Sequence, residues 1–305
     1  MNCALNTFHS GFVAVVGRPN VGKSTLLNAL LGQKVAIVSS RPQTTRRKQL
    51  GILTVSEGQI VFVDTPGIMK PRQALDKHMV DVASSVFGDA DIVLWVTDAS
   101  ELPTAADEHI GELVARAQPS IPVLILNKCD RLKPEQADAR IAAYRALAPT
   151  AKGLLVSAVR GDNLNEIVPL LLSLLPEGPQ YYAEDEVTDF TLRDMAAELV
   201  REAALVELHD EVPHGVAVVI DDFVESPDRP AHVTAILYVE RESHKGIVIG
   251  KGGEMLKRIG IRARREFERQ LGSQAYLELH VKVREGWRQD ENALKRLGYG
   301  ENDER

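Results

Sequence analysis

The chain of 305 residues is 44% hydrophobic and 26% charged, with a formal net charge of −7, which excludes a disordered or globally basic protein. This length suits two domains of ordinary size, each with its own core. The two cysteines, Cys3 and Cys129, exclude a disulfide framework, and without a long apolar stretch or a secretory signal we expect a cytoplasmic protein.

The first predicted elements are a buried strand and a helix joined by a glycine-rich loop. Residues 11–16 are mostly apolar, and residues 25–31 have the apolar periodicity of a helix. The phosphate loop between them, GRPNVGKS, has the G-x-x-x-x-G-K-[ST] form whose backbone N–H groups surround phosphate oxygens. We expect Lys23 to reach the β- and γ-phosphates and Ser24 to coordinate magnesium. The predicted nucleotide contacts here are Gly17, Arg18, Pro19, Asn20, Val21, Gly22, Lys23, Ser24 and Thr25.

A polar stretch without periodicity, SSRPQTTRRK at residues 39–48, predicts a mobile loop. One threonine of this loop would complete the magnesium shell when a γ-phosphate is present, and we favour Thr45 over Thr44. Residues 68–76 would form a second such switch, ordered by the γ-phosphate and released on hydrolysis. Alternatively, residues 39–48 are a solvated basic loop that does not switch.

The second motif, DTPG, follows the predicted strand at residues 59–63. Asp64 therefore lies at the carboxyl end of a strand, where it can hold magnesium through water, and the Gly67 N–H can reach the γ-phosphate. Many GTPases place a glutamine directly after this glycine to orient water. Here Ile68 stands in that position and cannot hydrogen-bond water, so water must be positioned by backbone groups, another side chain or a partner.

The third motif, NKCD, predicts which base is bound. It ends an apolar strand at residues 123–126, and the ionised carboxylate of Asp130 is an acceptor that matches the adjacent N–H donors of guanine. We expect Asn127 to tie this loop to the phosphate loop and Lys128 to lie along the base. Ser157 and Ala158 follow a further strand, and the Ala158 N–H is the expected donor to guanine O6. The four motifs in this order predict a GTPase that uses magnesium.

Alternating strands and helices over residues 1–176 predict an α/β domain with a mainly parallel sheet. A helix at residues 163–175 would close this domain, and Pro176 would stop it. Residues 177–188 contain one proline, one glycine and several acidic residues without periodicity, which is typical of a linker.

Residues 189–305 predict a second, α+β domain with the order helix, strand, strand, two short helices, strand and helical tail. The predicted ranges are 190–208 for the first helix and 215–225, 231–241 and 275–285 for the strands. Between the short helices lies the GKGG loop, residues 250–253, whose G-x-x-G form is that of KH domains and clamps a nucleic-acid backbone. The predicted RNA contacts are Ile247, Val248, Ile249, Gly250, Lys251, Gly252, Gly253, Lys257 and Arg258, with the three apolar residues forming a floor under unstacked bases.

The charge around the GKGG loop agrees with this interpretation. Residues 241–269 carry nine Lys/Arg and four Glu, a net charge of +5 on an acidic chain. Such a local basic stretch favours a polyanion-binding face, and RNA is favoured over duplex DNA because KH domains take single strands with splayed bases. The alternative is a solvated helix after an ordinary glycine-rich turn.

A GTPase domain followed by a type II KH domain resembles the Era family of bacterial ribosome-assembly GTPases, through GRPNVGKS, QTTR at residues 43–46, DTPG, NKCD, SA and VIGKGG. The resemblance implies binding to 16S rRNA near its 3′ end during 30S maturation, with a peripheral contact to the inner membrane, and we expect a monomer. GTP would favour the arrangement that binds RNA better.

Asn20 resembles the asparagine by which some bacterial GTPases bind potassium, which predicts slow, potassium-stimulated hydrolysis. Alternatively, Asn20 only structures the loop.

Two other function classes stay open. One is a GTPase that acts on a membrane or division partner, with the basic stretch contacting lipid headgroups. The other is an RNA chaperone in which hydrolysis is incidental.

Overall fold

A computed structural model describes residues 7–39, 41, 43–226 and 229–299, which leaves Cys3 and two residues of the predicted switch loop, Ser40 and Pro42, outside the described residues. The chain divides into two compact units. The first contains Met1–Ala36, Thr45–Lys70 and Met79–Asp189, and the second contains Ile37–Thr44, Pro71–His78 and Phe190–Arg305. Residues 177–188, predicted as a linker, thus fall within the first unit.

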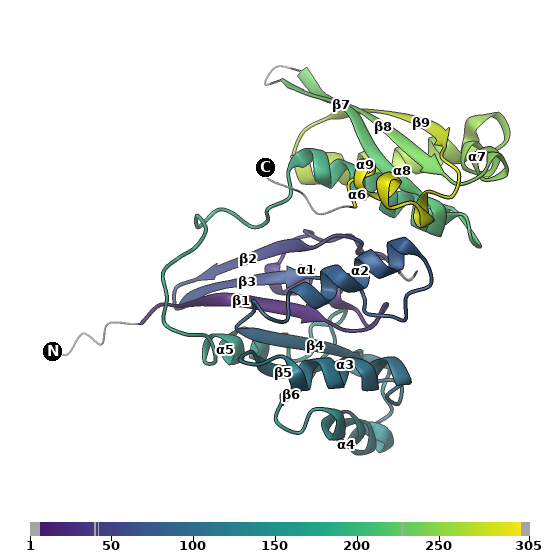
Figure 1. The fold of residues 1–305 in the computed structure, drawn as a ribbon. Coiled ribbons are helices and arrows are strands. Elements are labelled where there is room, and N and C mark those ends of the chain that lie inside the picture. Colours follow the sequence, from purple (N-terminus) through teal and green to yellow (C-terminus); the bar gives the residue numbers. More distant parts are fainter. Residues whose placement is uncertain (1–6, 40, 42, 227–228, 300–305) are drawn as a thin grey trace. The chain divides into compact units, whose positions relative to one another are not determined.

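The first unit is built on a six-stranded sheet with the order β2-β3-β1-β4-β5-β6 (Figure 1). Only β2 runs antiparallel, to β3, and the other pairings are parallel. The predicted α/β class with a mainly parallel sheet is confirmed, and β2 is a strand that we did not predict. The strands are β1 (His9–Val16), β2 (Gln49–Val55), β3 (Gly58–Asp64), β4 (Ile92–Asp98), β5 (Ile121–Asn127) and β6 (Lys152–Leu155).

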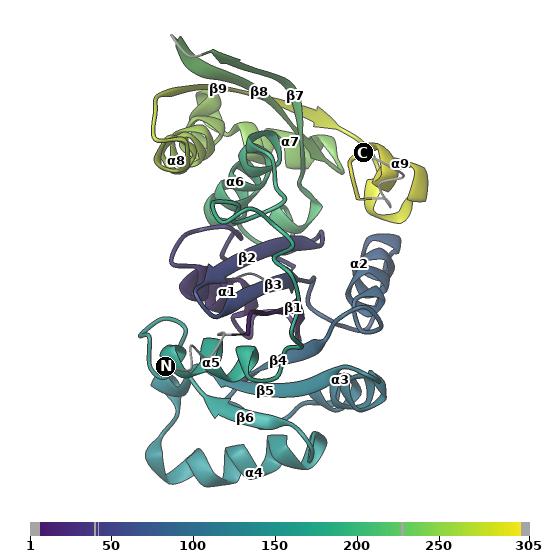
Figure 2. The same cartoon turned by 90° about the vertical axis from the view of Figure 1, so that its left-hand side faces the viewer.

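Helices cover both faces of this sheet, as Figure 2 shows. On one face α1 (Lys23–Leu31) and α5 (Ile167–Leu172) pack on a core that includes Val13 and Val15. The opposite face is covered by α2 (Ala74–Ser85), whose later turns belong to this unit, α3 (Ala105–Arg116) and α4 (Ala137–Leu147). Because successive side chains of a strand point to opposite faces, the continuous apolar run of β1 supplies both cores. Such a sheet brings the carboxyl ends of its parallel strands to one edge.

The segment between residues 177 and 189 is fixed to the sheet by hydrogen bonds. The fully buried Gln59 accepts from the Tyr181 and Tyr182 N–H groups at 2.8 and 3.0 Å and donates to the Tyr182 carbonyl at 2.9 Å. The Ile52 N–H donates to the Val187 carbonyl at 2.9 Å. This segment has no helix or strand, as its composition suggests, but it is an anchored strap.

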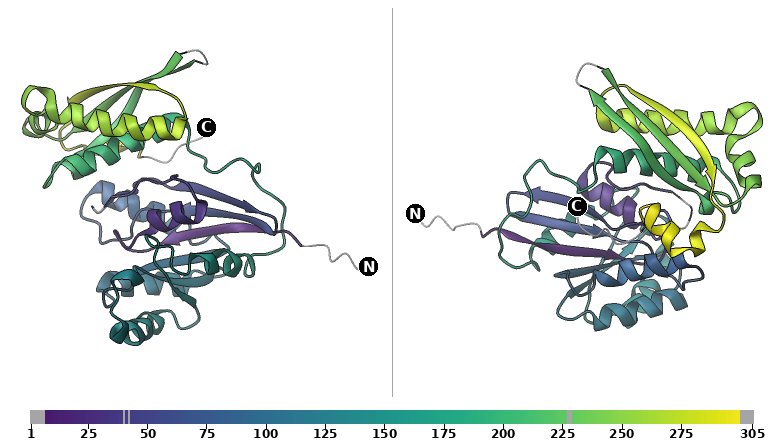
Figure 3. Two further views of the ribbon diagram at one scale, coloured as in Figure 1. Left: turned by 180° about the vertical axis from the view of Figure 1, so that it is seen from behind. Right: turned by 45° about the horizontal axis from the view of Figure 1, so that its top comes forward.

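The second unit contains a three-stranded sheet with the order β7-β8-β9. Strand β7 is antiparallel to β8, and β9 is parallel to β8. Figure 3 shows the helices gathered on one face of this sheet, where α6 packs along α8. The predicted α-β-β-α-α-β order is confirmed. The elements are α6 (Leu192–Glu207), β7 (Ala217–Ser226), β8 (Arg229–Val239), α7 (Glu242–Ile249), α8 (Glu254–Leu271), β9 (Ala275–Val283) and α9 (Glu291–Arg296).

The helix after the GKGG loop is longer than predicted. Helix α8 has 18 residues, because Ile259, Ala263 and Phe267 repeat every four residues and keep one face in the core. It ends at Gly272, whose φ of 71° provides the left-handed C-cap. Within the described residues, no helix combines the length and the apolar content that crossing a membrane requires.

Candidate nucleotide site and RNA interface

The phosphate loop lies between β1 and α1 and is packed too closely for side chains at two glycines. A Cβ on Gly17 would lie 2.2 Å from the Val96 carbonyl oxygen, and one on Gly22 would lie 2.4 Å from Asn127 Nδ2. Lys23 Nζ donates to the carbonyls of Gly17 and Arg18 at 3.1 and 3.2 Å. Burial lowers the pKa of Lys23 to about 8, and the charge of Asp64 opposes this shift. The loop is therefore a rigid cradle with a buried ammonium group, as phosphate binding requires.

The outer side of the phosphate loop is held by an ion-pair network that we did not predict. Arg18 pairs with Glu101 at 2.6 Å and with Asp107 at 3.2 Å, and Asp107 is completely buried. Asp107 also closes the capping box of α3 with Thr104. The T-x-x-D pattern at residues 104–107 was a visible signal for the cap. Nothing in the sequence connected it to Arg18.

Three oxygen-bearing side chains meet where magnesium was predicted. Ser24 Oγ donates to Asp64 Oδ2 at 3.0 Å and lies 3.0 Å from Thr45 Oγ1, which itself lies 3.3 Å from Asp64 Oδ2. In the described part of the chain, the buried Asp64 Oδ1 has no hydrogen-bond partner. Desolvation by burial raises the pKa of Asp64, while Lys23 and the hydrogen bonds from Ser24 and Thr45 lower it. An unpartnered buried oxygen beside two hydroxyls fits the oxygen ligands that Mg²⁺ takes.

The two candidate threonines differ in what their hydroxyls do. Thr44 Oγ1 donates to the Arg41 carbonyl at 2.9 Å, whereas Thr45 Oγ1 lies beside Ser24 and Asp64. Only Thr45 thus has its hydroxyl at the predicted metal position. Thr44 instead folds its side chain back onto its own loop.

The DTPG segment lies against the phosphate loop. The Ile68 N–H donates to the Gly17 carbonyl at 3.1 Å, and the Ile68 side chain is 1% exposed in the core. A Cβ on Gly67 would lie 2.6 Å from the Pro19 nitrogen, so only glycine allows this approach. The burial of Ile68 agrees with the prediction that its side chain does not orient water.

The base-binding motif is joined to the phosphate loop. Asn127 Nδ2 donates to the Val21 carbonyl at 2.9 Å, as predicted, and Lys128 Nζ donates to the Asn20 carbonyl at 2.6 Å and to Asp98 Oδ2 at 2.7 Å. Asp98 ends β4 at the carboxyl edge of the sheet, a position that could have identified it in the sequence.

The partners of Asp130 and Ala158 complete this part of the site. Ser157 Oγ donates to Asp130 Oδ1 at 2.6 Å and orients that carboxylate. The Ala158 N–H donates to Asn127 Oδ1 at 3.0 Å. The expected hydrogen bond from this N–H to guanine O6 stays a prediction. Ala158 thus helps to hold Asn127 between the two loops.

In the second unit, the GKGG loop joins α7 to α8 and is exposed. Gly250, Gly252 and Gly253 have φ values of 73°, 62° and 83°, a region that favours glycine. An added Cβ at Gly252 or Gly253 would meet nothing within 4 Å, so space is open above the loop. The first turn of α8 follows directly, and the partial positive charge of a helix N-terminus favours a phosphate.

The predicted apolar floor is smaller than expected. Ile247 is 49% exposed and Ile249 is half-buried, but Val248 is completely buried in the core of the second unit. A run of three apolar residues does not reveal which of them faces the core of a short helix. Val248 therefore supports the loop from below and offers no surface to a base.

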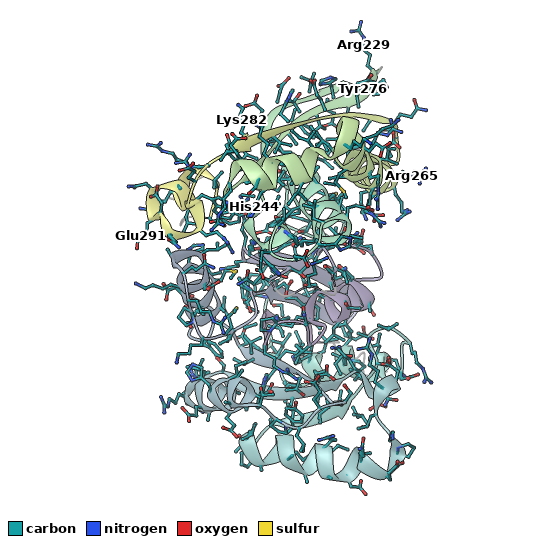
Figure 4. The ribbon with its side chains drawn as sticks, turned by 90° about the vertical axis from the view of Figure 1, so that its right-hand side faces the viewer. Arg229, His244, Arg265, Tyr276, Lys282 and Glu291 are labelled. Atoms are coloured by element: carbon teal, nitrogen blue, oxygen red, sulfur yellow. The ribbon has the colours of Figure 1, made fainter. Side chains whose placement is uncertain are left out.

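Basic side chains surround the GKGG loop. Lys251, Lys257 and Arg258 are exposed, and Figure 4 shows Arg265 extending from α8. Arg258 and Arg262 both pair with Glu207 at the end of α6. Our sequence reasoning missed this acidic partner, because Glu207 lies about fifty residues before the basic stretch.

Comparisons with known proteins match both units. A family model described as 50S ribosome-binding GTPase matches residues 12–128, and one described as a KH domain matches residues 211–288. The chain is similar to GTPase Era of Geotalea daltonii, with 46% identity over 96% of this chain and 98% of that protein. It is also similar to GTPase Era of Ruminiclostridium cellulolyticum, with 45% identity over 97% and 99%.

Two solved structures have the same fold over nearly the whole chain. One is Era in complex with MgGDPNP and nucleotides 1506–1542 of 16S ribosomal RNA, with a TM-score of 0.92, 39% identity, and coverage of 96% of this chain and 99% of that one. The other is a point variant of Aquifex aeolicus Era bound to GDP.AlF4⁻, with a TM-score of 0.91, 39% identity, and coverage of 96% and 100%. The order of the nucleotide motifs, the KH fold and these full-length similarities agree, and the chain belongs to the Era family of GTPases.

Proposed function

We propose that this GTPase binds 16S rRNA near its 3′ end and assists maturation of the 30S ribosomal subunit. The observation that carries the proposal is the presence, in one chain, of a magnesium-nucleotide site and a GKGG loop with open space above it. The relative solved with MgGDPNP and nucleotides 1506–1542 of 16S rRNA shares this fold over its full length. The proposed RNA contacts are those that remain exposed or half-buried around the GKGG loop.

In the proposed cycle, GTP and magnesium hold Thr45 beside Ser24 and Asp64, and RNA binds better to that state. Such coupling is reciprocal, so RNA also strengthens GTP binding by the same factor, and typical couplings of about 1–3 kcal/mol give about 5- to 150-fold. Hydrolysis removes the γ-phosphate that keeps Thr45 in place and so weakens the hold on RNA.

The experiment is an affinity measurement with a single-stranded RNA that copies the 3′ end of small-subunit rRNA. We expect tighter binding with a non-hydrolysable GTP analogue than with GDP, and weaker binding to a scrambled RNA of the same length. A salt titration separates base recognition from bulk charge. Salt-sensitive binding that ignores both RNA sequence and nucleotide would contradict the proposal and favour a membrane or other partner.

Potassium is a further part of the proposal. The Ile68 side chain is buried and cannot orient water, and Asn20 sits in the phosphate loop with a φ of 66°. A monovalent cation held beside Asn20 would supply positive charge at the transferring phosphate. Turnover should therefore be faster in potassium chloride than in sodium chloride, and Asn20→Ala should remove the difference. Equal wild-type turnover in both salts would contradict this part.

We further propose a cytoplasmic monomer with a peripheral membrane contact. A ribosomal partner supports the cytoplasmic location, and the exposed basic side chains of α8 are suited to anionic headgroups. Sedimentation velocity tests the monomer, and flotation with anionic liposomes in the absence of RNA tests the membrane contact. A stable dimer, or no co-flotation at low salt, would contradict the respective point.

A further inference from the structure

One carboxylate in the second unit holds two arginines of the proposed RNA surface. Glu207 is the last residue of α6, and its side chain is 8% exposed. Arg258 Nη2 donates to Glu207 Oε2, and Arg262 Nε donates to Glu207 Oε1 at 2.8 Å. The two arginine side chains are 62% and 52% exposed, so they cover the carboxylate and face solvent themselves.

The geometry follows from helix packing. Arg258 and Arg262 are four residues apart on α8, so both side chains lie on the same face, and α6 packs along that helix. The hydrogen bond from Arg262 lowers the pKa of Glu207 most, desolvation opposes it, and the charge of Arg258 lowers it further. The carboxylate is therefore ionised at neutral pH. Each guanidinium has five N–H donors, and the bonds to Glu207 use only some of them.

The arrangement changes both the charge and the direction of the arginine pair. Two arginines alone would present two positive charges, whereas the trio presents one. Glu207 sits on the protein side of both guanidiniums, so a phosphate can approach from solvent without displacing it. Arg258 lies five residues beyond Gly253, about 7–8 Å along the helix from the GKGG loop. This is within reach of the next phosphates of a strand clamped by that loop.

We infer that Glu207 is a positioning residue that raises the RNA specificity of this surface. Its negative charge cancels one of the two positive charges that attract RNA of any sequence. Its two carboxylate oxygens fix the two guanidiniums in one orientation. The inference rests on the proposed RNA-binding function. A purely structural ion pair would stabilise the contact of α6 with α8 but would leave the salt dependence of RNA binding unchanged.

The test is Glu207→Gln, compared with wild type by anisotropy using the 3′-end RNA and the scrambled RNA from 50 to 500 mM potassium chloride. Each phosphate contact to a single strand contributes about 0.7 to the slope of log affinity against log salt. In Glu207→Gln we expect the slope for scrambled RNA to steepen by about 0.7, which is an additional loss of affinity of about fivefold over that salt range. We also expect the preference for the 3′-end RNA to fall.

Glu266→Gln is the matched control, because it removes one carboxylate from an ion pair on the same helix, that with Arg269. It lies four residues beyond Arg262 and eight beyond Arg258, about 6 and 12 Å along α8, and so is farther from the GKGG loop than either arginine. We expect a smaller slope change there. Equal changes in the two variants would show a bulk charge effect and overturn the inference. In an Arg258→Ala, Arg262→Ala background, Glu207→Gln should have no effect on the slope.

Glu207→Asp keeps the charge but shortens the side chain, so it tests orientation even if Glu207→Gln does not fold. We expect the wild-type slope with a reduced preference for the 3′-end RNA, and an unchanged preference would overturn the orientation part. If wild type binds the 3′-end RNA but Glu207→Gln changes only the melting temperature, the inference fails and the proposed function stands. If wild type binds neither RNA, both fail.

Discussion

The phosphate loop and the GKGG loop both place glycines ahead of a helix, but they need them for different reasons. At Gly17 an added Cβ would meet the Val96 carbonyl oxygen at 2.2 Å, whereas at Gly252 it would meet nothing within 4 Å. Other segments of the first unit hold the phosphate loop in place, through the contacts of Arg18, Asn127 and Lys128. In the GKGG loop, Gly250 is packed against Met255, but an added Cβ at Gly252 or Gly253 would meet nothing within 4 Å. The phosphate loop is therefore held in one conformation by its neighbours, whereas the GKGG loop leaves space in which a nucleic-acid strand can lie.

The largest expected effect is from Gly17→Ala. The new Cβ meets a strand backbone that cannot move aside, and the φ of 152° is unfavourable for alanine. Overpacking and backbone strain together cost roughly 4 kcal/mol in the binding conformation. The free loop should relax out of that conformation, and GDP must restore it, so GDP affinity should fall about a thousandfold. Fluorescent GDP titration measures the affinity, and melting measures stability. Near-normal GDP binding would show that the loop is less rigid than its packing indicates.

Next comes Gly252→Asp or Lys251→Asp. Each places a negative charge where a phosphate is proposed to bind, so binding to the 3′-end RNA should fall about a hundredfold or below detection. GDP affinity, set by the first unit, should survive. Unchanged RNA affinity would count against the assignment of the GKGG loop.

Asp107→Asn tests the outer support of the phosphate loop. Loss of the buried charge beside Arg18 should loosen the loop and speed GDP release about tenfold, which is about 1.4 kcal/mol. Stopped-flow release of a fluorescent GDP measures the rate. The control is Glu112→Gln on the same helix, whose ion pair with Arg116 is exposed and contributes little. Equal release rates in both variants and wild type would show that Arg18 does not control the loop.

The smallest expected effect separates conformation from space. Gly252→Ala has room for its methyl group but keeps a φ of 62°, so it should destabilise the second unit by about 1–2 kcal/mol. Gly246→Ala, in helix α7 and equally open, should stabilise it by about 0.5–1 kcal/mol. Chemical denaturation measures both. The same sign for the two variants would contradict the conformational account of this loop.

The residues proposed to contact the nucleotide could be predicted because each belongs to a short motif at a strand end. Ser24, Asp64 and Asn127 lie where their motifs placed them, and the choice of Thr45 agrees with the structure. Contacts that depend on how helices pack could not be predicted. The pairing of Asp107 with Arg18 and that of Glu207 with Arg258 join segments far apart in the sequence, and no local pattern encodes them.

Part of the fold could be predicted from the sequence, and part of it could not. Alternating apolar runs gave the parallel strands and the order of the second domain. Strand β2 was missed because it directly follows the polar switch stretch, and α8 was thought short because its many charges conceal the repeat of Ile259, Ala263 and Phe267. Val248 and its neighbours in the sequence are all apolar, so only the tertiary structure shows which one is buried.

The anchored strap changes the length of the tether between the two domains. A free chain of twelve residues would let its ends separate by roughly 20 Å on average. Here the Leu50 N–H donates to Asp189 Oδ1 at 2.8 Å, and Thr191 already caps α6, so only Phe190 lies between them. Two residue steps reach about 7 Å. The strap thus shortens the free chain between the two domains from about twelve residues to Phe190 alone.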